Sequence, residues 1–315
     1  FVAIRGRADA AARNLLFEGI AFEDAAWKLP AFGYIGIQAG HHGTSTSERT
    51  YVLPVAIECI YARDCAFDNC RIAHLGACAV GFGAGCRDNT VSHCTITDIG
   101  GNGVLVGWRG LRDRHNAELI GDPSLAADWR NSDDVPQGNA VEHCTITRCG
   151  AINRGCVGIF DAFAQGTRIA HNHVSDMPYT GISIGFRWNE SETSQRGCHV
   201  EYNHVHDVMK MLADGGAIYT LGYQPGTVLR GNLLHDVHRS RFAHGGAPNN
   251  GIFFDQGSKG YLVEENIIYN TSGESIRFNQ TSRENLRWKN NHFGVAPDDP
   301  SFPTEAAQKA GPQHD

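Results

Sequence analysis

The sequence predicts an all-β protein folded as a right-handed parallel β-helix, a solenoid of short stacked strands. The first observation is a recurring pattern: an apolar residue, two variable residues, a Cys or Asn, a variable residue and another apolar one. The second is a short strand in each unit that begins at Gly and alternates apolar residues, as in residues 103–106 and 181–184. Such alternation, bounded by Gly, Asn and Asp, indicates short half-buried strands, and its repetition indicates a solenoid.

The Cys or Asn of each unit is an anchor by which the coils can be aligned. Successive anchors lie 24, 50, 28, 31, 29, 34 and 25 residues apart, and the longest interval holds a polar excursion over residues 109–137. Parallel strands stack about 4.8 Å apart, so we expect the anchors to form one inward column, with hydrogen bonds passed between the asparagines. The anchors are Cys70, Cys94, Cys144, Asn172, Asn203, Asn232, Asn266 and Asn291.

Composition argues against several other classes of protein. Glycine supplies 37 of the 315 residues, which suits the tight turns of stacked coils. The formal charge is −7 and no stretch is rich in Lys or Arg, so nucleic acid is not an expected partner. No apolar run approaches the ~18 residues of a membrane span, and we expect no membrane partner. The 10 cysteines include no C-x-x-C pair, which favours buried free thiols over disulfides or a zinc site.

The repeat also sets the expected domain organisation. We expect residues 1–294 to form a single β-helix domain, and residues 295–315, rich in Pro, Asp and Gln, to leave it as a loose C-terminal tail. The chain begins at Phe1, and the strand-like residues 15–22 follow closely. We therefore expect a fragment of a longer chain, lacking the N-terminal part of its β-helix. We expect the protein to be a monomer.

One group of acidic residues belongs to the repeat. These residues follow the anchors by four positions, and a polar residue that recurs at a fixed place in each coil is best explained as a turn-former. They are Asp98, Asp176, Asp207 and Asp236, with Asn270 in the same position of a later coil.

Two other aspartates break the repeat. Asp214 precedes the strand that starts at Gly216, and Asp255 ends the strand over residues 251–254, where sister coils have Gly. With Ile252 and Phe254 inward, alternation turns Asp255 out onto the sheet face. Acids on the outer face of a β-helix, with aromatic residues near by, resemble a carbohydrate cleft.

Further residues are candidates for binding a sugar. Tryptophans that follow equivalent strands could stack on sugar rings, although loop packing is an equally good explanation. Histidines in the coil between the two aspartates could bind hydroxyls, or could be ordinary surface and turn residues. Other histidines alternate onto one strand face without an evident third ligand, so we expect no metal. The substrate-binding candidates are Trp108, Asp161, Arg187, Trp188, His235, His238 and His244.

Four segments resemble glycoside hydrolase family 141, and the similarity covers residues 14–293. They are residues 102–104, residues 178–183, residues 214–222 with 225–227, and residues 255–258, of which the Asp-Gly-Gly…Ile-Tyr-Thr-Leu-Gly element is the most specific. The resemblance implies a right-handed β-helix, extracellular or periplasmic, that acts on plant cell-wall glycans. Activities in this family include α-L-fucosidase and xylanase. By motif, the resemblance makes Asp214 and Asp255 the catalytic pair.

The chemistry implied by this resemblance needs two carboxyl groups and no cofactor. One protonates the leaving oxygen, and the other attacks the sugar or activates water. We expect Asp255 to be the nucleophile. The carboxyl groups should lie about 5–5.5 Å apart in a retaining enzyme and about 6.5–9.5 Å apart in an inverting one.

The repeat register makes this pairing difficult. Matching Gly216 to Gly251 places Asp255 over Thr220, six positions beyond Asp214. At about 3.3 Å per residue the two would be ~20 Å apart, unless the chain before the strand folds back over the sheet. Otherwise Asp255 needs another partner, and Asp161 and Glu190 are the reserves.

Two alternatives stay open. The first is a polysaccharide lyase acting on uronans, which would need a base and a group that neutralises the substrate carboxylate; Arg187, Arg239 and Arg241 are available for that. The second is a glycan-binding β-helix without catalytic activity. The two pattern-breaking aspartates argue against the second alternative, and the scarcity of basic clusters argues against the first.

Overall fold

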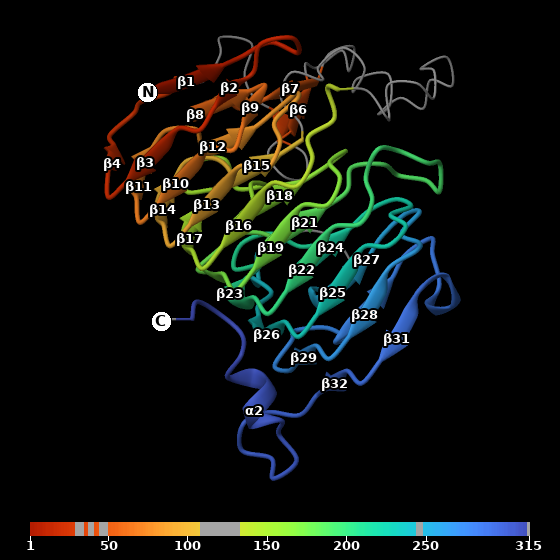
Figure 1. Ribbon diagram of the computed structural model, residues 1–315. Helices are drawn as coiled ribbons and strands as arrows, with labels where there is room; N and C mark the ends of the chain where they lie inside the picture. Colours follow the sequence, from red (N-terminus) through yellow and green to blue (C-terminus); the bar gives the residue numbers. More distant parts are fainter. Residues whose placement is uncertain (29–34, 37–40, 44–49, 108–132, 244–247, 314–315) are drawn as a thin grey trace.

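The computed structural model describes residues 1–28, 35–36, 41–43, 50–107, 133–243 and 248–313, and the architecture is a right-handed parallel β-helix (Figure 1). Three parallel sheets of nine strands each run along the solenoid. The first sheet contains β1 (Val2–Arg5), β8 (Val55–Ile60), β12 (Cys78–Phe82), β15 (Val104–Val106), β18 (Ile159–Asp161), β21 (Ile182–Ile184), β24 (Gly216–Thr220), β27 (Asn250–Phe254) and β30 (Ile276–Phe278).

The other two sheets complete each coil. The second contains β3 (Leu16–Glu18), β10 (Ala66–Asp68), β13 (Thr90–Ser92), β16 (Ala140–Glu142), β19 (Arg168–Ala170), β22 (His199–Glu201), β25 (Val228–Arg230), β28 (Leu262–Glu264) and β31 (Arg287–Lys289). The third contains β4 (Ala21–Glu23), β11 (Arg71–Leu75), β14 (Thr95–Ile99), β17 (Thr145–Cys149), β20 (His173–Ser175), β23 (His204–Val208), β26 (Leu233–Val237), β29 (Ile267–Ile268) and β32 (His292–Phe293).

A few short elements lie outside these sheets. They are the parallel pair β2 (Ala12–Arg13) and β9 (Ala62–Arg63), the antiparallel β5 (Ile35–Gly36), β6 (His41–Gly43) and β7 (Thr50–Val52), a 3₁₀ turn η3 (Arg283–Asn285) and the helix α2 (Thr304–Ala307). In the described part of the chain, no helix is long and apolar enough to cross a membrane.

Each coil has three strands: one is the strand that begins at Gly, and the other two lie within the anchor motif. The anchor motif spans two strands, because the residue before the anchor has a positive φ and turns the chain by a corner. Asn69 before Cys70 has φ 49°, and His171 before Asn172 has φ 54°. The recurring turn acids have a similar backbone: φ is 56° at Asp98 and lies between 48° and 58° at the other four positions. Asn and Asp adopt this left-handed conformation more readily than most residues, which supports their interpretation as turn-formers.

The anchors form the expected inward column. Asn232 shows the pattern: its Oδ1 accepts from the backbone N and from Nδ2 of Asn203, at 3.0 Å each, and its Nδ2 donates to Val200 O at 2.8 Å and to Asn266 Oδ1 at 2.9 Å. The cysteines continue the column, since the backbone N of Cys70 donates to Cys94 Sγ at 3.4 Å. All 10 cysteines are buried free thiols, as expected.

Columns of aliphatic and aromatic side chains fill the interior. Removing each such side chain from water contributes about 1.5–3 kcal/mol, so stacked columns account for much of the fold's stability. The column from the first sheet consists of Ile57, Val80, Val104, Ile159, Ile182, Ile218 and Ile252, all fully buried.

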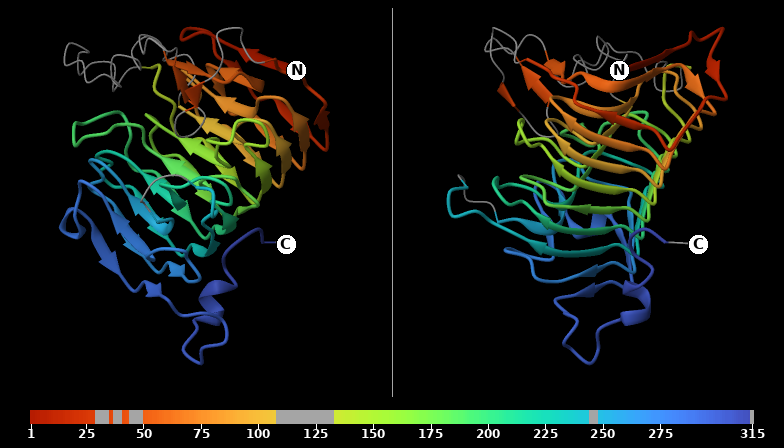
Figure 2. Two further views of the ribbon diagram at one scale, coloured as in Figure 1. Left: turned by 180° about the vertical axis from the view of Figure 1, so that it is seen from behind. Right: turned by 90° about the vertical axis from the view of Figure 1, so that its left-hand side faces the viewer.

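The C-terminal residues pack against the solenoid, which contradicts the expectation of a loose tail. After the last coil, the chain runs back along the side of the molecule (Figure 2). The ring of Phe302 meets the edge of Tyr269 at 5.9 Å, and the backbone N of Gly311 donates to Tyr202 O at 2.8 Å. The backbone N of Gln313 donates to His143 Nδ1 at 3.3 Å. The tail thus covers exposed rings at the corner between the second and third sheets.

Candidate functional site

The outer face of the first sheet carries an unusual column of large side chains. Ile252 and Phe254 point into the solenoid, so Phe253 between them lies on the opposite face of the sheet, and parallel pairing places Tyr219 and Arg277 beside it on neighbouring strands. Phe253 and Tyr219 are nevertheless buried, at 0% and 1% exposed. The Tyr219 and Phe253 rings meet edge to face at 5.2 Å, and the Arg277 guanidinium lies 4.3 Å from the centre of the Phe253 ring. We call these three residues the outer column.

Asp255 lies at the end of β27, next to the outer column. Its carboxylate accepts a short hydrogen bond from the Tyr219 hydroxyl and another, of 2.6 Å, from Asn279 Nδ2. The residue is only 6% exposed, and its backbone N donates to Thr220 O. Two side-chain donors from the coils on either side therefore hold one carboxylate in a fixed orientation.

Asp214 lies before β24, at the opposite end of the same strands. Its backbone has φ 65°, which allows the chain to bend just before Gly215, and the Tyr179 hydroxyl donates to its carbonyl O at 2.9 Å. The carboxylate is 60% exposed and pairs with Arg277 at 3.3 Å. Because Arg277 comes from β30, this contact brings the Asp214 carboxylate out over the face of the sheet.

The structure corrects the register assumed from the sequence by one residue. Gly216 pairs with Asn250 rather than Gly251, so Phe254 lies beside Thr220 and Asp255 follows one position later. Aligning the two glycines misplaced the strand, because the two residues make room for different neighbours. A Cβ at Gly216 would clash with the Asn250 carbonyl, and one at Gly251 would clash with the Ile268 side chain and the Ser275 carbonyl. Asp214 and Asp255 are joined indirectly, through Arg277, Phe253 and Tyr219.

The loop that holds Arg187 and Trp188 lies at the Asp255 end of the sheet. A Cβ at Gly257 would clash with the Asn189 backbone, and Gly257 has φ 74°, so glycine permits this close approach of the two loops. Trp188 is partly buried and meets the Phe186 ring edge to face at 4.5 Å. Arg187 Nε donates to Asn189 Oδ1 at 3.1 Å. Glu190 in the same loop pairs with Lys259 at 2.8 Å.

Asp161 is inside the core, which contradicts its prediction as a substrate-binding residue. Alternation along β18 points it inward with Ile159, and it has no exposed surface. The Thr167 hydroxyl donates to its Oδ1 at 2.9 Å and Gln195 Nε2 donates to its Oδ2 at 2.5 Å. Burial raises the pKa of Asp161 to about 6 despite these bonds. The Asp161 carboxyl accepts hydrogen bonds from buried polar side chains, and without exposed surface it cannot contact a glycan.

The candidate histidines lie away from Asp255. His235 is on the outer face of the third sheet, where its Nε2 lies 2.8 Å from His204 Nε2 and its ring stacks on Tyr269. Burial lowers the pKa of His204 to about 3 and lowers that of His235 as well. His238 is exposed and pairs with Asp207 at 2.8 Å, in the turn that leads toward the Asp214 end of the sheet. His235 therefore belongs to a separate surface.

Trp108 and His244 lie outside the described residues. Among the residues that the structure does describe, no group of three or more His, Cys, Asp or Glu side chains could hold a metal ion.

Four residues of this site were not predicted from the sequence: Tyr219, Phe253, Arg277 and Asn279. Tyr219 could have been found from alternation, since it stands between the inward Ile218 and Thr220. Arg277 and Asn279 come from a coil whose strand does not begin with Gly, so the repeat pattern gave no signal for them.

Comparisons with known proteins agree on the fold. No family model and no curated protein matches the sequence. One solved structure, described as a glycoside hydrolase, superimposes with a TM-score of 0.83 at 23% sequence identity, covering 98% of this chain and 52% of that one. The chain thus spans about half the length of that protein.

Two other solved structures are more distant. The complex of XylC with xylose has a TM-score of 0.44 at 11% identity, covering 71% of this chain and 35% of that one. The A-module of the mannuronan C-5 epimerase of Azotobacter vinelandii has a TM-score of 0.41 at 10% identity, covering 76% and 63%. The likeness to the first structure, the one described as a glycoside hydrolase, establishes the β-helix fold.

Proposed function

We propose that the protein is a glycoside hydrolase that cleaves glycans of the plant cell-wall type, with Asp255 and Asp214 as its catalytic carboxyl groups. The observation that carries the proposal is the setting of Asp255, an aspartate on the outer face of a β-helix, oriented by Tyr219 and Asn279 and bordered by aromatic rings. The likeness in fold to a solved glycoside hydrolase is in keeping with it.

The two carboxylates have environments that suit different roles. Asp255 is held by two donors in a nearly buried position, which suits a nucleophile or a base that must meet one atom of the sugar. Asp214 is exposed at the opposite end of the same strands, so we propose that it acts as the acid after it leaves Arg277 and moves toward Asp255. The Trp188 loop, at the Asp255 end, would border the sugar.

We further propose that the substrate resembles those of α-L-fucosidases or xylanases, and that the protein works as an extracellular or periplasmic monomer without a cofactor. The hydrolytic chemistry itself needs only the two carboxyl groups and water. Since all 10 cysteine thiols are buried, they are shielded from the oxidants of such a compartment.

A lyase acting on uronans is the second candidate. The observation that favours it is Arg277, a cation on the same face as the Tyr219 hydroxyl, because a lyase needs a base and a cation near the substrate carboxylate. The two candidates predict different products from the same substrate.

The experiment is a panel of aryl glycosides, xylans and uronans incubated with the wild-type protein and with Asp255→Asn. New reducing ends without unsaturated uronate, lost in the variant, are the result expected of the hydrolase. Unsaturated uronate absorbance would contradict hydrolysis and select the lyase. Glycan binding with no product from the wild-type protein would select a binding module.

A further inference from the structure

A groove crosses the coils on the turn that leads from the third sheet to the first. Its lower part is a hollow of about 270 Å³, and Met177 and Met211 are among the residues that line it. Its upper part is a hollow of about 420 Å³, and Trp27 is among the residues that line it. Asp98 and Ala151 line both hollows, so the two hollows adjoin along the same side of the solenoid. We call the two together the turn groove.

The turn groove has the length of a short oligosaccharide. It extends from the coil of β4 to the coil of β23, which are separated by five steps in the third sheet. At ~4.8 Å per step the groove is about 24 Å long. Its axis runs along the stack of coils, so a chain bound in it would contact successive turns in sequence.

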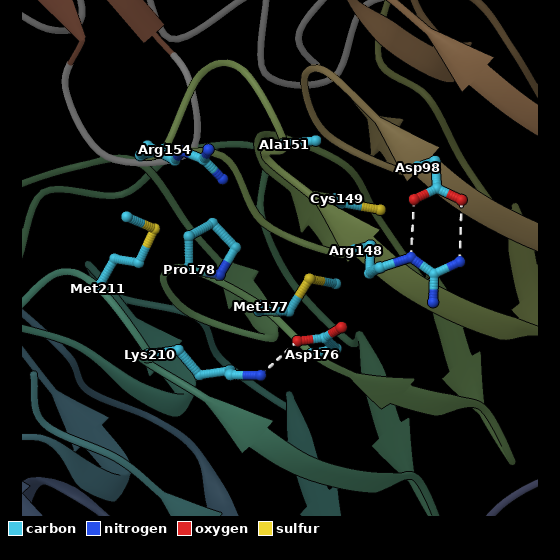
Figure 3. A pocket seen from close by; sticks show the side chains of 10 residues that line it. All are labelled: Asp98, Arg148, Cys149, Ala151, Arg154, Asp176, Met177, Pro178, Lys210 and Met211. Carbon is cyan, nitrogen blue, oxygen red and sulfur yellow. Dashed lines mark hydrogen bonds and ion pairs between the residues drawn. The ribbon is translucent and has the colours of Figure 1, made fainter.

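The lining combines apolar surface with fixed polar groups (Figure 3). Met211, which is 47% exposed, supplies apolar surface to the lower hollow, whereas Met177 and Pro178 in its lining are buried. Beside them, Arg148 donates to both oxygens of Asp98, at 2.7 and 2.8 Å.

A second ion pair, Lys210 with Asp176 at 2.5 Å, lies next to Arg148, because Asp98, Arg148 and Asp176 occupy the same turn position in successive coils. Sugars present C–H faces and hydroxyl groups, and this lining offers apolar contacts for the former with donors and acceptors for the latter.

Arg154 is the one charged residue of the lower hollow that makes no ion pair within the described part of the chain. It is exposed, and its Nη1 donates a weak hydrogen bond of 3.4 Å to Gly150 O. The lower hollow therefore has one positive charge in excess, since Arg148 and Lys210 are balanced by acids, in a protein whose formal charge is −7. An unpaired guanidinium at the rim of a polar groove is suited to a carboxylate, which it can bind through two parallel N–H donors.

We propose that the turn groove is a second carbohydrate-binding site, separate from Asp255, which takes an oligosaccharide that carries a uronate and holds its carboxylate with Arg154. Such a site would keep the protein on an acidic polysaccharide while the site at Asp255 acts on a glycosidic bond. The binding proposal does not depend on the activity proposed for Asp255.

Calorimetric titration with tetragalacturonate and with its methyl ester tests this proposal. Asp255→Asn serves as the background, so that turnover cannot consume the ligand. We expect binding of the acid, and a loss of about 10- to 100-fold in affinity with Arg154→Gln, because a hydrogen-bonded charge contact is removed. The ester should bind this background protein more weakly by a similar factor, and its affinity should not change with Arg154→Gln.

Arg196→Gln is the matched control. Arg196 is also exposed, and its Nε makes a weak bond of 3.4 Å to Ser194 O, but it lies outside the turn groove. It should bind tetragalacturonate like the background protein. Equal affinity for acid and ester, equal losses in the two arginine variants, or no binding of tetragalacturonate would each overturn the proposal. Preferential binding of an extended peptide would overturn it in favour of a protein partner.

Discussion

At the scale of single residues, the same side chain serves three different purposes in this molecule. Asp98 supports a turn with a positive φ, Asp161 satisfies polar groups in the core, and Asp255 is presented on the outer face. Residue type therefore does not identify the site. Position within the coil does, because inward, corner and outward positions impose different burial and different hydrogen-bond partners.

Tyr219 should act as a positioning residue for Asp255. We expect Tyr219→Phe to lower kcat by about 10- to 100-fold, because a hydrogen bond to a charged group is lost while the ring packing on Phe253 remains. KM should change little. Tyr269→Phe, on the outer face of the third sheet, is the control and should retain wild-type kinetics. A loss confined to KM would argue that Tyr219 binds substrate instead.

Asp161 should make stability depend on pH in an unusual direction. Its folded-state pKa of about 6 lies above the unfolded value, so folding favours its protonated form. The stability that it contributes is fully present below about pH 4 and is lost as pH rises through about 6, by about 3 kcal/mol in total. Urea unfolding of Asp161→Asn across pH 3.5–7.5 should show the difference from wild type shrinking, or changing sign, as pH rises. A constant difference would contradict the assignment.

At the scale of the structural elements, the anchor column shows how much of this fold the sequence could predict. The recurring Cys or Asn identified the inward corner correctly, because a stacked column tolerates only small or self-complementary side chains. The corner within the anchor motif, which divides it into two strands, could not be predicted, since a turn at one residue of positive φ has no strong sequence signature. The ion pair between Asp214 and Arg277 could not be predicted, because it joins side chains from coils 63 residues apart in the sequence.

Asn232 provides a test of the column. Asn232→Ala removes four hydrogen bonds and leaves buried backbone groups without partners, so we expect a loss of about 3–5 kcal/mol in the free energy of unfolding. Asn232→Cys should lose clearly less, because Cys94 and Cys144 occupy the same column and accept or donate through sulfur. Denaturant unfolding of both variants measures the difference. Equal losses would show that the side-chain bonds of the column do not matter.

At the scale of the whole molecule, the three sheets of the solenoid present different groups of side chains on different sides. Asp255 and the outer column lie on the first sheet, His235 lies on the third, and the tail covers the corner between the second and the third. The docked tail could not be predicted from its composition. Its contacts are made by one aromatic ring and by backbone groups, and neither follows the repeat.

The tail should contribute stability without contributing to activity. Ending the chain at Gly294 removes the Phe302 ring contact and the hydrogen bonds to Tyr202 and His143, so we expect a loss of about 2–4 kcal/mol. The urea midpoint should fall while the kinetics of glycan cleavage stay the same. An unchanged midpoint would mean that the tail is loose after all.

The central claim is that the outer face at Asp255 is a site of glycan hydrolysis, and one comparison of rates tests it most directly. Reducing-end release is measured for Asp255→Asn and for Asp236→Asn, a matched change at a turn acid with φ 49° on another part of the coil. The proposal predicts a fall of about 10²- to 10⁴-fold in kcat for Asp255→Asn and a near-wild-type rate for Asp236→Asn. Equal rates in the two variants would contradict it.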